Sequence, residues 1–170
     1  MEFRLGKAED LPQIEQIIAD AVELMRESGL DQWQKGYPNI DIIRDDQQKH
    51  VNYVLAEEGK VLGVVMVQTW GEVSYNQIDG AWLNDEPYGS LHRVCVAKDQ
   101  KGKGIAGHLF AEGIKILRAK GFKNVRIDTH KDNVRMRHAL EKAGFSYCGT
   151  IQLVGGPEDG GLRVGYQYTA

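Results

Sequence analysis

A glycine-rich stretch, KDQKGKGIAGHLF at residues 98–110, has the residue types and spacing of an anion-binding loop. Its glycines let the backbone approach a ligand closely, and successive N–H groups between Gly102 and Ala106 can converge on one anion. The helix expected to follow adds its positive N-terminal end, and Lys101 and Lys103 add local charge. These features predict a phosphate-binding loop, while a glycine-rich turn without a ligand is the structural alternative.

The same glycines match, letter for letter, the G-x-G-x-x-G pattern of dinucleotide-binding loops. In those loops the first glycine makes the turn directly out of the strand. Here five residues separate Val96, which ends an apolar run, from Gly102, and half of the chain precedes the loop. Asp128 is nevertheless placed where a ribose-binding acid would lie. The spacing therefore disfavours a dinucleotide-binding oxidoreductase, which is kept as an alternative.

Length and charge restrict the class of protein. Residues 1–170 suit a single domain with a sizeable core, and the formal net charge of −3 gives no general reason to expect a nucleic-acid partner. The apolar runs are too short to cross a bilayer, so no membrane partner is expected. Cys95 and Cys148 lie in apolar runs, and the N-terminus lacks the pattern of a signal peptide. Together these features predict a cytoplasmic protein.

Hydrophobic periodicity predicts alternating helices and strands. A strand at residues 3–5 precedes a helix for which Asp10 and Gln13 form a plausible capping box, and EEGK reads as a four-residue hairpin loop. The other expected elements are helices at 40–49, 107–120 and 133–142, and strands at 52–56, 61–69, 91–96, 125–129, 145–153 and 163–169. This order predicts a mixed α/β (α+β) domain with a central, mostly antiparallel sheet and one parallel crossover.

The stretch VCVAKDQKGKGIAGHLF resembles the acetyl-CoA-binding motif of the GNAT acyltransferases. In that motif a V-x-V strand precedes a loop of the form R/Q-x-x-G-x-G/A and then a helix. Further along, an asparagine and the run LEKAGF resemble the family's second cofactor-side segment, with the family's spacing. The matching positions are Val94, Cys95, Val96, Lys101, Gly104, Ala106, Asn133 and the run at 140–145.

This resemblance implies a splayed sheet with helices on both faces and acetyl-CoA as the cofactor. Pantetheine would lie between the strands at 91–96 and 125–129, and the pyrophosphate would lie over the glycine loop. The chemistry needs no metal, and none is expected. The implied cofactor-binding residues are Val94, Cys95, Val96, Lys101, Gly102, Lys103, Gly104, Ile105, Ala106 and Asn133.

Two positions depart from the family pattern. Lys101 replaces the usual arginine or glutamine, which keeps the charge but loses bidentate geometry. Leu140 fills the position of a tyrosine that often protonates the departing thiolate, so no proton can come from there. Because a thiol of pKa about 8.5 is already a tolerable leaving group, proximity and backbone N–H groups can still sustain transfer.

His92 is the candidate for the base that takes a proton from an ammonium substrate. It precedes the cofactor strand, alternates in phase with Val94 and Val96, and belongs to the residue type that titrates near neutrality. A histidine packed in the sheet is the structural alternative. Weaker candidates come from the poorly patterned stretch at 70–90: Glu72, Asp85 and Glu86.

These observations predict an acetyl-CoA-dependent N-acetyltransferase that moves the acetyl group directly to a primary amine. Cys95 lacks a paired base and is expected to be a core residue, not a nucleophile. A non-catalytic acyl-CoA-binding module, suggested by Leu140, is the other alternative. The acceptor, a small molecule or a peptide, stays open because its pocket would come from loops at 31–39, 70–90 and 154–161. A homodimer, common for the fold, also stays open.

Overall fold

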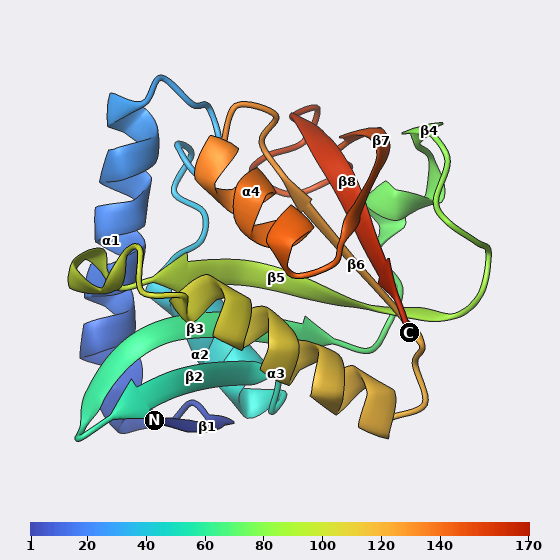
Figure 1. Ribbon diagram of the computed structural model, residues 1–170. Coiled ribbons are helices and arrows are strands. Elements are labelled where there is room, and N and C mark those ends of the chain that lie inside the picture. Colours follow the sequence, from blue (N-terminus) through green and yellow to red (C-terminus); the bar gives the residue numbers. More distant parts are fainter.

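The computed structural model describes residues 1–170 and contains one eight-stranded sheet (Figure 1). The strands follow one another across the sheet in the order β1-β2-β3-β5-β6-β8-β7-β4. Every neighbouring pair is antiparallel except β5 and β6, which are parallel, so the predicted fold class is confirmed. The strand bounds are β1 Glu2–Leu5, β2 Asn52–Glu57, β3 Lys60–Gln68, β4 Asp79–Gly80, β5 Tyr88–Val96, β6 Asn124–Thr129, β7 Ser146–Gln152 and β8 Leu162–Thr169.

Helices cover both faces of the sheet because its central strands are apolar on both sides. On β3, Val64 packs into the cluster beneath α1 and α2, whereas the next residue, Val65, packs into the cluster beneath α3 and α4. This alternation follows from the two-residue period of a strand. None of the helices has both the length and the apolar character needed to cross a membrane. The helix bounds are α1 Leu11–Glu27, α2 Ile40–Gln48, α3 Ile105–Ala119 and α4 Val134–Lys142.

The parallel pair β5–β6 is short, and its strands then diverge. Pairing runs only from Tyr88↔Asn124 to Ser90↔Arg126, after which β5 pairs with β3 alone and β6 with β8 alone. Figure 1 shows the two strands meeting at one end and separating toward the other. One edge of β5 is therefore left without a strand partner.

A bulge in β5 interrupts the alternation of its side chains. His92 lies opposite Met66 and Cys95 lies opposite Val64, so Arg93 and Val94 share the space opposite one residue of β3. Arg93 has a positive φ of 51°. The extra residue puts His92 out of phase with Val94, and the predicted alternation between them is wrong.

Two local predictions near the N-terminal half also need correction. The β2–β3 connection is a two-residue turn, in which Glu58 and Gly59 both have positive φ. The expected capping box does not form, because the Asp10 carboxylate accepts hydrogen bonds from the Arg4 guanidinium at 2.7 and 2.9 Å. Gln13 instead bonds to the hairpin backbone at residues 59 and 61.

Candidate active site

The loop before α3 presents backbone N–H groups to open space. Gly102 and Gly104 have φ values of 79° and 77°, which glycine adopts without strain, and α3 begins at Ile105, two residues before the predicted start. A Cβ atom added at either glycine would meet nothing within 4 Å. No backbone carbonyl accepts from the amides of Gly102, Gly104, Ile105, Ala106 and Gly107. The loop is thus built to bind an anion at a helix N-terminus.

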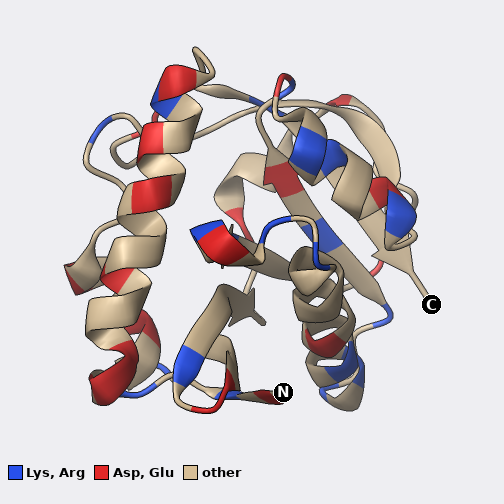
Figure 2. Cartoon of the chain, turned by 60° about the vertical axis from the view of Figure 1, so that its left-hand side comes forward, with Lys and Arg blue, Asp and Glu red and all other residues tan.

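Lysine positions, coloured blue in Figure 2, lie along this loop. Asp99, the carboxylate of the loop, is already paired with Lys60. Burial lowers the pKa of Lys101, and repulsion from Arg135 in the first turn of α4 lowers it further. Two neighbouring cations of this kind favour binding of a phosphate. Arg135 was not predicted from the sequence.

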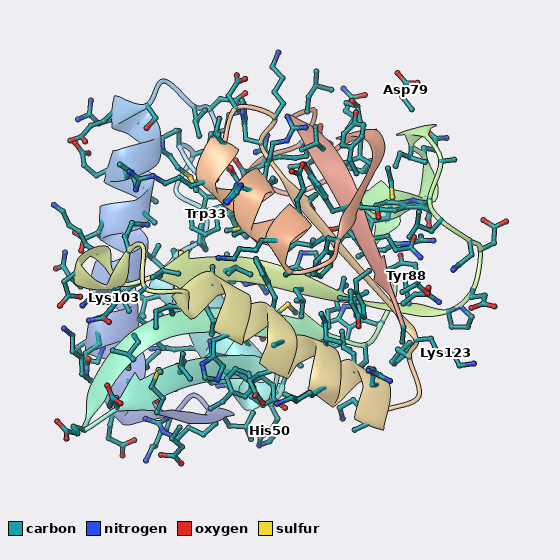
Figure 3. All side chains as sticks on the ribbon, viewed as in Figure 1. Trp33, His50, Asp79, Tyr88, Lys103 and Lys123 are labelled. Carbon is teal, nitrogen blue, oxygen red and sulfur yellow. The ribbon has the colours of Figure 1, made fainter.

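A cavity of about 230 Å³ lies where β5 and β6 diverge. Its lining comes from these two strands and from loops near residues 32–37, 72–74 and 153–158. Figure 3 places Tyr88 near the closed end of the splay, and Trp33 and Lys103 toward its open end. Of the predicted site residues, the cavity brings together His92, Val94 and Asn133, and of the three weaker carboxylate candidates it includes only Glu72.

The other predicted residues have different surroundings. Cys95 packs beneath α1 on the opposite face, and burial raises the pKa of its thiol to about 12. Leu140 is fully buried in the cluster beneath α3. Asn133 caps α4 by accepting a hydrogen bond from the Met136 amide at 3.3 Å. None of these three side chains is placed as a nucleophile or an acid.

His92 lies among polar groups within the cavity. Its Nε2 atom is 2.9 Å from the Ser90 hydroxyl and 3.9 Å from the Glu72 carboxylate, and its ring stacks on Tyr75. Burial, together with the neighbouring Arg93 guanidinium, lowers the pKa of His92 to about 3. The imidazole is therefore neutral at physiological pH.

Asp128, near the end of β6, is the cavity residue whose role the sequence left open. The Tyr75 hydroxyl donates to its Oδ2 atom at 2.7 Å, and burial raises the pKa of the carboxyl to about 6. A carboxylate near the end of an otherwise apolar strand was the sequence signal for such a group. The sequence suggested for it only the role of a ribose-binding acid.

Two loops are tied together along the cavity. Glu158 accepts a hydrogen bond from the Trp33 amide at 2.9 Å and one from Arg163 at 3.0 Å. Asp31 is 3.0 Å from His130 and 3.7 Å from Arg163. The loops predicted to form the acceptor pocket, near residues 31–39 and 154–161, are thus joined by the Trp33–Glu158 hydrogen bond and by Arg163 of β8, which contacts both Asp31 and Glu158.

A mixed sheet that splays at its parallel pair, with an anion-binding loop after the splayed strand, is the architecture of an acetyltransferase. Residues 17–145 match the model of the acetyltransferase (GNAT) family. The chain belongs to this family, which confirms the resemblance found in the sequence and rules out the dinucleotide-binding fold. No curated protein matches the chain.

Solved structures agree with this assignment. A GNAT-family acetyltransferase from Streptococcus agalactiae is 33% identical, with a TM-score of 0.87 over 99% of this chain and 95% of the other. A ribosomal-protein-alanine N-acetyltransferase from Brucella melitensis is 21% identical, with a TM-score of 0.72 and full coverage of both chains. Salmonella typhimurium yncA, solved with its cofactor acetyl-CoA, is 18% identical, with a TM-score of 0.71 over 99% of this chain and 93% of the other. The last two support the fold alone.

Proposed function

We propose that the protein is an acetyl-CoA-dependent N-acetyltransferase that moves an acetyl group directly to a primary amine. The observation that carries the proposal is the unpaired edge of β5, which runs from the cavity toward the unpartnered amides before α3. A strand edge can hydrogen-bond the amides of pantetheine, and the loop can hold the pyrophosphate. Salmonella typhimurium yncA, which shares the fold, was solved with acetyl-CoA as its cofactor.

The residues present fit acetyl-CoA. Its phosphates suit the glycine loop, which offers unpartnered amides, open space above the glycines and the cations Lys101 and Arg135. Its pantetheine suits the unpaired backbone of β5 near Val94. When bound, acetyl-CoA supplies a thioester whose acetyl carbon an amine can attack. The proposed cofactor-binding residues are Val94, Cys95, Val96, Lys101, Gly102, Lys103, Gly104, Ile105, Ala106 and Asn133.

Asp128 is the proton acceptor that the geometry supports best. It would receive the proton that the amine nitrogen loses as the nitrogen–carbon bond forms and the carbon–sulfur bond breaks. A base works best when its pKa lies near the working pH, and the pKa of Asp128 is about 6 whereas that of His92 is about 3. The role of His92 as the base, predicted from the sequence, stays a prediction. The pH dependence of kcat/KM distinguishes it from Asp128.

No side-chain acid takes the role of the missing tyrosine. Leu140 is buried, and Tyr147 is half exposed and packs on Tyr166 outside the cavity. The thiolate would therefore leave without a protein proton donor and take its proton from water. Stabilisation of the developing oxyanion would fall to N–H groups at the bulge of β5.

We also propose that the reaction takes place in the cytoplasm. Both cysteines, Cys95 and Cys148, are unpaired. Unpaired cysteines suit a reducing compartment.

Calorimetric titration of the purified protein with acetyl-CoA, followed by an assay of thiol release with amines, tests the function. Saturable binding and amine-dependent thiol release are expected. Binding without release to any amine would favour the non-catalytic acyl-CoA-binding module. Absence of binding would overturn the proposal.

A further inference from the structure

The charges in the cavity wall are unevenly paired. Its two arginines are already neutralised: Arg93 contacts Asp46 at 2.7 Å, and Arg163 contacts Glu158 at 3.0 Å. The lining contains no lysine. A ligand carboxylate that entered this cavity would therefore find no free cation to bind.

Two carboxylates of the cavity, in contrast, lack a cationic partner. Asp128 accepts a hydrogen bond from Tyr75 but forms no direct ion pair. Burial raises its pKa, although the charge of Arg163, which is already paired with Glu158, acts to lower it. The Oε1 atom of Glu72 caps the turn at Ser74, and its Oε2 atom lies 3.9 Å from the neutral His92 and forms no ion pair with a lysine or arginine. The cavity consequently carries net negative charge, which favours a ligand with more than one positive centre.

Two buried polar atoms in the cavity wall also lack partners. The Oε1 atom of Gln32 and the hydroxyl of Thr129 make no hydrogen bond, and these residues are only 8% and 1% exposed. Buried polar groups are nearly always satisfied, and each orphan acts against folding unless a ligand or water meets it. The amide oxygen is an acceptor only, so it requires a donor such as an amino or hydroxyl group.

The volume of the cavity limits the size of the acceptor. About 230 Å³ lies below the ~300–1,000 Å³ typical of sites for drug-sized ligands, and the acetyl end of the cofactor must share the space. The loops joined through Glu158 and Trp33 border the same space. This volume suits a short, unbranched molecule better than a folded chain.

We propose that the acceptor is a short diamine or polyamine: a small amine with a second protonated nitrogen and no carboxylate. One nitrogen reacts beside Asp128, while the second, still protonated, binds between Glu72 and the orphan oxygen of Gln32. This inference rests on the proposed N-acetyltransferase function and names the substrate class of the same site. Glu72 acts as a specificity residue, distinct from the proton acceptor.

A set of amines of one chain length tests the proposal. Butane-1,4-diamine, 4-aminobutanol, butylamine and 4-aminobutanoate differ only at the far end, which is an ammonium, a hydroxyl, a methyl or a carboxylate. With acetyl-CoA saturating, kcat/KM is expected to be about tenfold higher for the diamine than for butylamine, because one extra charge-assisted contact forms. The amino alcohol should fall between them, and the amino acid should be the poorest substrate.

Two variants connect this preference to named residues. Glu72→Gln keeps an oxygen for the Ser74 cap but removes the charge, and it should bring the diamine and butylamine to within about threefold of each other, mainly through KM for the diamine. Gln32→Leu should remove the preference for the amino alcohol over butylamine. Asp79→Asn, which neutralises an exposed carboxylate on β4 outside the cavity lining, is the matched control and should leave the ratios unchanged.

Three results would overturn the inference: butylamine equal to the diamine, a preference for 4-aminobutanoate or a peptide N-terminus, or no transfer to the diamine. The titration with acetyl-CoA separates these from failure of the function itself. If the protein binds acetyl-CoA and acetylates another class of amine, only the inference about the acceptor falls. If it does not bind acetyl-CoA, both proposals fall.

Discussion

The Arg93 guanidinium donates to both carboxylate oxygens of Asp46, each at 2.7 Å, and so connects the bulge of β5 to α2. Both side chains are largely buried, and the Tyr37 hydroxyl lies 2.6 Å from the same guanidinium. Arg93 is the residue of the bulge with positive φ. The ion pair therefore holds the segment that sets the faces to which His92 and Val94 point.

Loss of this pair should destabilise the fold strongly. Asp46→Ala leaves a buried, uncompensated guanidinium, and the free energy of unfolding is expected to fall by about 3–5 kcal/mol. Asp41→Ala removes an exposed i,i+3 pair with Arg44 on the same helix and should cost about 1 kcal/mol at most. Urea denaturation of both variants measures the difference. Equal losses would show that the buried pair does not stabilise the bulge.

The pH profile should report Asp128. The carboxylate must be ionised to accept a proton, so kcat/KM is expected to fall as the pH drops through about 6. Tyr75→Phe removes a hydrogen-bond donor that stabilises the ionised form, so this limb should move to higher pH by about one unit. Tyr53→Phe is the control, because the Tyr53 hydroxyl lies outside the cavity and has no side-chain hydrogen-bond partner. This variant should leave the acid limb of the profile in place.

The same experiment separates Asp128 from His92. Asp128→Asn should lower kcat for every amine, because it removes the proton acceptor. A base with the pKa of His92, about 3, would give no acid limb between pH 5 and 8. A profile that is flat in this range, together with full activity of Asp128→Asn, would assign the proton to another group.

Affinity for acetyl-CoA should depend on the cations beside the glycine loop. Lys101→Ala and Arg135→Ala each remove a charge-assisted phosphate contact and are expected to raise the Kd about tenfold. Lys123→Ala removes an equal charge at an exposed position next to β6, which Figure 3 shows far from Lys103. Calorimetry at one ionic strength compares the three. Equal weakening by all would indicate a general charge effect without a specific phosphate site.

Placing the family's tyrosine at position 140 should not provide an acid for the departing thiolate. Leu140 is 0% exposed in the hydrophobic cluster beneath α3 and α4, so Leu140→Tyr overpacks the core. It is expected to lower the free energy of unfolding by about 1–3 kcal/mol. Leu140→Met, similar in volume, should cost less than about 1.5 kcal/mol. Thermal denaturation compares the two variants. A faster, equally stable tyrosine variant would contradict this expectation.

Local sequence patterns were sufficient for most of the fold. Alternating and helical periodicities predicted every long element within a few residues, and the spacing around Gly104 was specific enough to indicate the family. The prediction that failed at the site depends on tertiary pairing. The side chains of His92 and Val94 point to opposite faces of the sheet because β5 forms a bulge where it pairs with β3. No pattern within β5 alone reveals which residue the bulge inserts.

The missed side chains lie far apart in the sequence. Tyr75 and Asp128 meet only because the loop after β3 packs against the end of β6, and Arg135 approaches Lys101 only because α4 returns beside the glycine loop. The stretch at 70–90 lacked a periodic pattern because most of it is irregular, with one 3-10 turn at Val73–Asn76 and a two-residue strand. The cavity depends on these long-range contacts.

The short parallel ladder has a thermodynamic consequence. The sheet consists of a half that ends at β5 and a half that begins at β6, and three residue pairs join them. A molecule that binds in the splay would hydrogen-bond along one half while it packs against the other, and so would act as an additional strand. Occupancy should therefore couple the unfolding of the two halves, and a ligand at 100 times its Kd would raise the free energy of unfolding by about 2.7 kcal/mol. Binding of the cofactor and cooperative unfolding of the two halves of the sheet thus depend on the same unpaired edge of β5.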